Sequence, residues 1–154
     1  MSFAADLVRP NTRIMTNRPL AYIVKDQKPL VLAAHETVQQ ACRCMRKRRA
    51  GSVLVVDNQQ QLCGIFTGRD AVHALAEGRD AAVTALAQAM TPNSITIALE
   101  NRAIDALRAM SDGGFRHLPV VENGRIWGVV SRGDFKGMEI DRLDEETHLW
   151  ECIR

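Results

Sequence analysis

The strongest constraint on the fold is an internal repeat that spans most of the chain. Shifted by 65 residues, the segment 28–58 aligns with 93–123, with identities at several Ala, Arg, Met, Val and Asn positions. After the turn that follows, "GIFTGRD" (64–70) aligns with "GVVSRGD" (128–134). Two copies are too few for a stacked solenoid. The repeat therefore predicts a duplicated small domain.

Each copy has the pattern of a short strand, a helix, a β-hairpin and a second helix. The short apolar strands are expected at 30–32 and 95–97. The first helix of each copy is predicted by apolar residues at i, i+3, i+4 and i+7, namely Val38, Ala41, Cys42 and Met45, and Ala103, Ala106, Leu107 and Met110. "DGG" ends the second of these helices, because glycine readily adopts a positive φ. The hairpins flank "DNQQ" and "ENG", and the second helices are expected at 71–78 and 134–139.

The length and composition permit a buried core, with 154 residues, 46% of them apolar and 25% charged. One β-α-β-β-α unit is too small to cover both faces of its sheet, so we expect an α/β (α+β) fold in which the two units pack on each other. The predicted boundaries are 1–22 for an N-terminal extension, 23–79 and 86–140 for the two units, and 141–154 for a C-terminal tail. The tail ends with Leu149, Trp150 and Ile153, and we expect it to dock on its own chain or on a second subunit.

The two heptamers allow a structural and a functional interpretation. A hydroxyl residue followed three positions later by an acid is a capping box. Thr67 would then accept from the helix backbone and Asp70 would reach back to it, with Ser131 and Asp134 arranged in the same way. A helix N-terminus also suits a phosphate, and a carboxylate suits the donor hydroxyls of a ribose. The motif alone favours the structural interpretation, because most such boxes only start helices.

Further motifs favour the functional interpretation. The duplicated unit, its two heptamers, "MTP" at 90–92 and "RHLPVV" at 116–121 together resemble a tandem pair of CBS domains (cystathionine-β-synthase-type), or Bateman module. The resemblance covers about residues 18 to 140, and we expect a stand-alone module of the type found in bacterial signal transduction. It implies that the units pack through their sheets about a pseudo-two-fold axis and leave two clefts. These clefts would bind an adenosine-containing ligand, AMP first, or ADP, ATP, NAD or S-adenosylmethionine.

The resemblance also implies the roles of individual residues. Asp70 and Asp134 would bind the ribose, Thr67 and Ser131 would lie on the phosphate side, and the adenine would lie near the backbone of Leu32 and Ile97. The phosphate-facing positions before the hairpin hold Arg116 and His117 in the second unit and Gly51 and Ser52 in the first. The arginine inside the heptamer also shifts, from Arg69 to Arg132. We therefore expect two non-equivalent sites.

These features predict a regulatory module rather than an enzyme, one that senses its ligand and relays a shape change to an unknown effector protein. The resemblance implies a homodimer, and the expected ligand needs no metal. Two alternatives stay open. The chain could be a structural dimerisation domain whose heptamers are only helix caps. It could also hydrolyse a nucleotide with His117, although the sequence has no P-loop and no evident metal-binding carboxylate cluster.

Charge and targeting signals narrow the remaining classes. The net charge is only +2, which argues against a nucleic-acid partner, and the basic run "RCMRKRR" (43–49) is interpreted as a solvated helix face. No apolar run reaches the length of a membrane span. The sequence begins without the pattern of a signal peptide, and its four cysteines show no CxxC pair. We expect reduced thiols and a cytoplasmic location.

Overall fold

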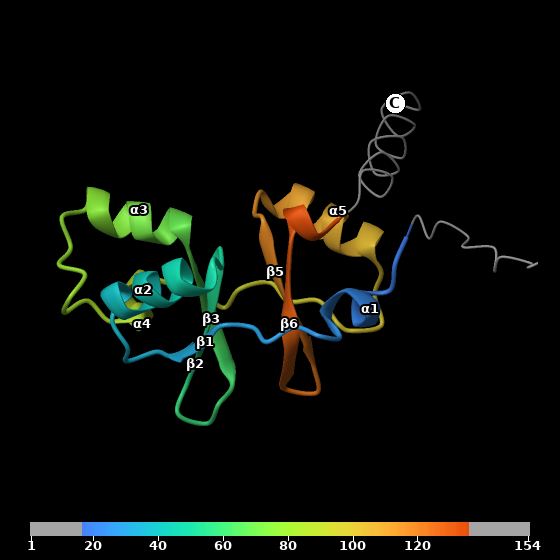
Figure 1. Cartoon of the computed structure of the whole chain (residues 1–154), viewed down its shortest axis with the longest axis horizontal. Helices are drawn as coiled ribbons and strands as arrows, with labels where there is room; N and C mark the ends of the chain where they lie inside the picture. Colours follow the sequence, from blue (N-terminus) through green and yellow to red (C-terminus); the bar gives the residue numbers. More distant parts are fainter. Residues whose placement is uncertain (1–16, 136–154) are drawn as a thin grey trace, which may run out of the picture.

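The computed structural model describes residues 17–135 and confirms the predicted α/β class. Its elements are α1 (Leu20–Val24), β1 (Val31–Ala33), α2 (Val38–Arg48), β2 (Ser52–Val56), β3 (Leu62–Thr67), α3 (Gly68–Ala76), α4 (Leu86–Ala89), β4 (Thr91–Pro92), α5 (Ala103–Gly113), β5 (His117–Glu122), β6 (Arg125–Ser131) and the 3₁₀ turn η1 (Arg132–Asp134). The two sheets lie side by side in the middle of the molecule, with α2, α3 and α4 on one outer side and α1 and α5 on the other (Figure 1). Both hairpin turns point the same way, as expected for units related by a pseudo-two-fold axis.

The first unit contains a four-stranded sheet in the order β1-β2-β3-β4. β1 runs parallel to β2, and the hairpin β2–β3 is antiparallel. β4 belongs to the linker that leads into the second unit, yet it pairs with β3 through Gly64 and Ile65. The core under α2 is apolar and includes Val38, Ala41 and Phe66. The linker is thus part of the first sheet.

The second unit contains the two-stranded hairpin β5–β6. The strand expected at 95–97 is reduced to a single parallel bridge between Ile97 and Val120. Its core combines α5 with Leu20 and Val24 of α1, which are 0% and 2% exposed. The short helix α1 lies before β1 in the chain, but its apolar side completes the second core.

The end of the second unit lies partly outside the described residues. Of the helix predicted at 134–139, the structure describes η1 and Phe135. The predicted docking of the C-terminal tail also falls outside the described range, as does the extension up to residue 16.

The long helices α2 and α5 are each 11 residues and end in the left-handed conformation. The residue in that conformation is Gly114 after α5 (φ 67°), as "DGG" predicts, but Arg49 after α2 (φ 51°). Both hairpins shift register at equivalent positions, after Val55 and after Val120. The duplication therefore extends to irregularities that no hydrophobic pattern specifies.

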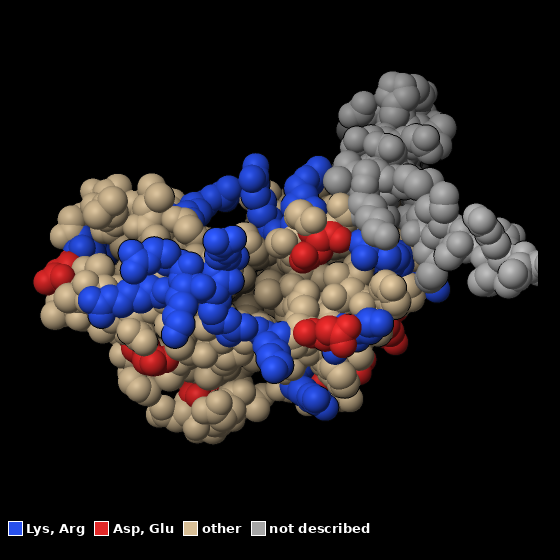
Figure 2. Space-filling view, viewed as in Figure 1, with Lys and Arg blue, Asp and Glu red and all other residues tan. Residues whose placement is uncertain are grey.

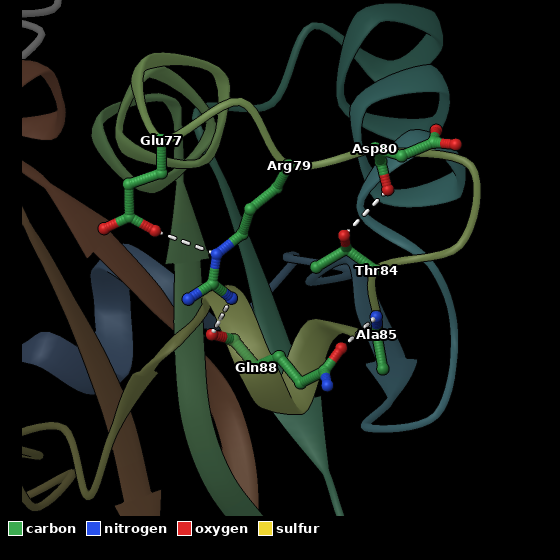
Figure 3. Close-up of polar contacts among 6 residues, drawn as sticks. All are labelled: Glu77, Arg79, Asp80, Thr84, Ala85 and Gln88. Atoms are coloured by element: carbon green, nitrogen blue, oxygen red, sulfur yellow. Dashed lines mark hydrogen bonds and ion pairs between the residues drawn. The ribbon is translucent and has the colours of Figure 1, made fainter.

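A compact loop joins α3 to α4 (Figure 3). Arg79 pairs with Glu77 (Nε to Oε2, 2.8 Å) and also donates to the backbone carbonyl of Gln88 (2.7 Å). Thr84 donates its hydroxyl proton to the carbonyl of Asp80 (2.7 Å), and the side chain of Gln88 accepts from the N–H of Ala85 (3.2 Å). These bonds fix α4 and, through it, the start of β4.

Candidate functional site

A cavity of about 460 Å³ lies between the two units, and both contribute to its walls. From the first unit come Gly51 and the turn from β3 into α3, including Thr67, Arg69 and Asp70. From the second come Phe115, Arg116 and His117, and the linker adds residues 91–95. A cavity of this size can enclose a small ligand such as one nucleotide.

Asp70 stands at the start of α3 with both carboxylate oxygens engaged. Its Oδ2 accepts from the backbone N–H of Thr67 (2.7 Å), which confirms the predicted contact from the acid back to Thr67. The Thr67 hydroxyl, the other member of the predicted capping box, donates its proton to the same carboxylate oxygen (3.0 Å). A charged carboxylate accepts the hydroxyl proton strongly, which stabilises this contact.

The other oxygen of Asp70 contacts a residue that sequence reasoning did not single out. Oδ1 accepts from the hydroxyl of Thr91 in β4 (3.0 Å). The pairing of Thr91 with Ile65 brings this threonine beside the heptamer. "MTP" marked the position as part of a motif, but no local pattern indicates which carboxylate its hydroxyl would reach.

The cavity holds three basic side chains. Arg69 is exposed and donates through Nη1 to the carbonyl of Gly114 (3.3 Å), which ties α3 to the end of α5 across the two units. Arg116 is exposed and His117 is half-buried. Burial is the main cause that lowers the pKa of His117 below its ordinary 6.5. The charge of Asp134 acts to raise this pKa, and the charge of Arg116 lowers it further. At neutral pH the two arginines are therefore the fixed positive charges of the cavity.

Gly51 lies at the cavity wall directly against the His117 side chain. A Cβ on residue 51 would come within 2.7 Å of the His117 Nε2. The neighbouring Ser52 is buried within β2 and does not line the cavity. The first unit thus offers the surface on which the imidazole of the second unit rests.

The second heptamer repeats the local geometry at Asp134. Its Oδ2 accepts from the N–H of Ser131 (2.7 Å) and from the Ser131 hydroxyl (3.2 Å). Arg18 donates to the backbone carbonyl of Asp134 (2.7 Å), and the N–H of Arg132 donates to the carbonyl of Arg116 (3.1 Å). None of these heptamer residues lines the cavity described above, so a second ligand site here stays a prediction.

The two residues at the expected adenine positions do not line the cavity. Leu32 packs against the first core and Ile97 against the second. The apolar walls of the cavity are instead Ile65, Pro92, Ile95 and Phe115. Leu32 belongs to the edge strand β1 and Ile97 to a single bridge, and both direct their side chains to a core, so contact of their backbone with the adenine stays a prediction. Sequence reasoning missed Phe115 and Ile95, although both flank motifs that it used.

Residues 17–135 also lack the features of a metal centre and of a membrane span. In that range no group of three or more His, Cys, Asp and Glu side chains could hold a metal ion. No helix there has the length and apolar character needed to cross a bilayer.

The family of the chain follows from comparison with known proteins. The model of the CBS domain matches it twice, over residues 13–77 and 83–138. The chain belongs to the CBS domain family. Among curated relatives, the CBS domain-containing protein CBSCBSPB5 of Arabidopsis thaliana is 39% identical over 127 residues, which are 82% of this chain and 23% of the plant protein. This CBS pair therefore spans about a fifth of the plant relatives that it matches.

Solved structures share the arrangement of the pair. A CBS-domain protein from Agrobacterium tumefaciens is 28% identical with a TM-score of 0.71, covering 79% of this chain and 92% of its own. A CBS domain protein from Pyrobaculum aerophilum complexed with AMP is 21% identical with a TM-score of 0.73, covering 83% and 98%. A CBS domain pair complexed with 5′-methylthioadenosine and S-adenosyl-L-methionine is 24% identical with a TM-score of 0.65, covering 79% and 91%. The last two likenesses bear on the fold.

Proposed function

We propose that this CBS pair is a regulatory module that binds an adenosine-containing ligand between its units and relays a conformational change to an effector protein. The observation that carries the proposal is the composition of the cavity. A carboxylate at a helix N-terminus comes from one unit, and Arg116 and His117 come from the other. A ligand that contacted both would favour one arrangement of the units over another, which is what a sensor requires.

The chemistry of the cavity suits a ribose with an anionic phosphate. The ribose hydroxyls are donors, and they could replace the Thr91 hydroxyl on Asp70. Arg69 and Arg116 can each hold phosphate oxygens through paired N–H groups. The apolar walls would face the base. The AMP complex of the Pyrobaculum aerophilum protein supports AMP as the first candidate, with ADP, ATP and NAD next. S-adenosylmethionine fits the ribose subsite but brings a cation towards two arginines.

The proposal has three further parts: a second ligand site, a homodimer and a cytoplasmic location. A second, non-equivalent site would use Asp134, Ser131 and Arg132. A homodimer is supported by α3, where Val72 and Leu75 are 65% and 79% exposed on one side of the helix. Cys42, Cys44 and Cys63 are free thiols, which suits a cytoplasmic location. We propose no catalysis and no metal requirement.

Thermal unfolding with AMP, ADP, ATP, NAD and S-adenosylmethionine tests the proposal. A ligand at about 100 times its dissociation constant should raise the midpoint by roughly 5–10 °C. Asp70→Asn should abolish the shift at the cavity, and Asp134→Asn should abolish any second shift. The matched control is Asp105→Asn, since Asp105 caps α5 in the same way (Arg102 N–H to Oδ2, 2.9 Å) but lies outside the cavity.

The alternatives predict different outcomes. No shift with any ligand, in protein freed of co-purified nucleotide, would leave a structural dimerisation domain. Chromatography of incubated nucleotide would reveal product if the module were a hydrolase. A shift that survives Asp70→Asn and Asp134→Asn would show that neither heptamer binds the ribose.

A further inference from the structure

Five cations cover the solvent side of α2 and its end: Arg43, Arg46, Lys47, Arg48 and Arg49, here called the α2 basic face. All five are exposed, while the opposite side of the helix packs on the first core. Lys and Arg side chains gather over α2 in one continuous area (Figure 2). Arg48 also donates to the carbonyl of Lys28, which adds a further exposed cation beside this face.

The charge of this face is local, and no described acidic side chain pairs with it. The whole chain has a net charge of +2, and the segment 43–49 holds five cations and no acid, so the rest of the chain has a net charge of −3. Within residues 17–135 none of the five cations forms an ion pair. Cations spaced three and four residues apart on one helix repel each other. The face therefore costs stability when it has no anionic partner.

The second unit shows that the fold does not need these cations. In the repeat alignment, the α2 basic face corresponds to Arg108, Ser111, Asp112, Gly113 and Gly114. α5 has the same length as α2 and has no basic residue in its last turn, so the helix dipole does not require them either. Arg49 even occupies a left-handed position (φ 51°) where the second unit has Gly114. At four of the five positions, the equivalent residue of the second unit is therefore not basic, although the helix has the same length.

We infer that the α2 basic face binds an acidic segment of a partner protein. An arginine guanidinium can bind a carboxylate through two parallel N–H groups. The face extends roughly 10 Å along one helix at 1.5 Å per residue, a length that matches a short run of Asp and Glu. Nucleic acid fits less well. Tyr22 is the only aromatic side chain among the strongly exposed large hydrophobic residues of the described part, and it lies on α1, so the face offers no base-stacking platform. Binding of an acidic segment to this face does not require a ligand in the cavity. The two sites are nevertheless close in the chain, because Arg49 lies two residues before Gly51 of the cavity wall.

Fluorescence anisotropy with a short fluorescein-labelled oligoglutamate peptide tests the inference on the full chain. The variant Arg46→Ser/Lys47→Asp/Arg49→Gly installs the residues that the second unit has at the equivalent positions. We expect the peptide to bind about tenfold more weakly or worse to this variant. The control Arg108→Asp/Arg125→Asp lowers the net charge by the same amount in the second unit, and it should stay within about twofold of the wild type at physiological salt.

Each other outcome overturns the inference. If the peptide does not bind the wild type at low salt, the α2 basic face is not a site for acidic segments. If both variants bind the peptide equally more weakly, the effect comes from net charge and not from this face. Tighter binding of single-stranded or duplex DNA through the same residues would assign the face to nucleic acid. If the triple variant unfolds, Arg43→Gln/Lys47→Gln is the substitute, because glutamine is a good helix former and replaces two cations in the middle of α2. This variant must also bind the peptide more weakly than the wild type. None of these readouts depends on AMP, so failure here leaves the nucleotide proposal standing.

Discussion

The two units build the same hairpin but complete its outer edge in different ways. In the first unit the edge of β3 pairs with a strand, because Thr91 and Pro92 of β4 lie opposite Ile65 and Gly64. In the second unit the equivalent edge at Val129 is met by a side chain. The Oε1 of Gln27 accepts from the Val129 N–H (3.0 Å). A linker strand closes one sheet, and an amide closes the other.

This difference reaches the candidate site. The strand that closes the first sheet carries the Thr91 hydroxyl to Asp70, which therefore accepts three hydrogen bonds. Asp134 accepts two at its carboxylate among the described residues, both from Ser131. Among the described residues, the same heptamer therefore has both carboxylate oxygens bonded in the first unit and Oδ2 bonded in the second. Non-equivalent affinities would follow from the edges of the sheets as well as from the basic residues.

The largest expected effect tests whether α1 belongs to the second unit. Leu20 is fully buried in the second core, so Leu20→Ala should lower the free energy of unfolding by about 2–5 kcal/mol. Tyr22→Ala, on the exposed side of the same helix (57% exposed), should change it by about 0.5 kcal/mol or less. Urea unfolding measures both. Hydrogen exchange should show protection lost first in β5, β6 and α5, and equal loss in β1–β3 would contradict this assignment.

A second prediction compares the two edges directly. A Cβ at Gly64 would come within 2.7 Å of the Thr91 carbonyl oxygen, which is backbone, whereas a Cβ at Gly128 meets the side chains of Gln27 and Val24 at 2.6 and 2.9 Å. Backbone in a sheet yields less than a side chain, so Gly64→Ala should cost about 2–3 kcal/mol and Gly128→Ala about 1–2 kcal/mol. Denaturant titration of the two variants gives the order. The reverse order would mean that the amide edge is the stiffer of the two.

The sequence predicted what short-range patterns determine. The apolar period placed α2 and α5, and the hairpins followed from their turns. The apolar stripe alone placed the second helix at 71–78, whereas the capping box placed its start at Thr67, and α3 does begin directly after this residue, at Gly68. The contacts of Gln27 with Val129 and of Thr91 with Asp70 span 102 and 21 residues. Such pairs are set by how the units pack, and no local period encodes them.

The candidate site divides in the same way. Asp70, Thr67, Arg69, Arg116 and His117 do meet at one cavity, because they flank turns that the repeat brings together. Leu32 and Ile97 do not line it, since their side chains pack against the two cores. The alignment also pairs His117 with Ser52, but it cannot show that the imidazole lies against Gly51 of the other unit. Positions within a repeat were predictable, and contacts between repeats were not.

A smaller effect is expected from the amide that closes the second sheet. Gln27→Leu removes the acceptor of the Val129 N–H, a part-buried donor, and should cost about 1–2 kcal/mol of unfolding free energy. Gln27→Glu keeps an oxygen at that place and should recover most of the loss at neutral pH. Thr91→Val is the matched change at the first edge, where the β4 pairing persists and Asp70 loses one of three donors. If Gln27→Leu is silent while Thr91→Val is not, the second edge is closed by something other than this bond.

The smallest expected effect is the pH dependence that His117 gives to the second unit near and below pH 6.5. Burial lowers the folded-state pKa of His117 below 6.5, so the unfolded chain binds its proton more readily. Unliganded protein should therefore lose stability as the pH falls through 6.5 towards the folded-state pKa, and the contribution should be constant above that window. His117→Ser, which installs the residue found at position 52 of the first unit, should flatten this part of the profile of unfolding free energy against pH. An anionic ligand beside the imidazole should act against burial. Its negative charge favours the protonated ring and should raise the folded-state pKa of His117. A stability profile that is the same with and without AMP would place the phosphate away from His117, and the two units would then differ in structure but not in how they sense the ligand.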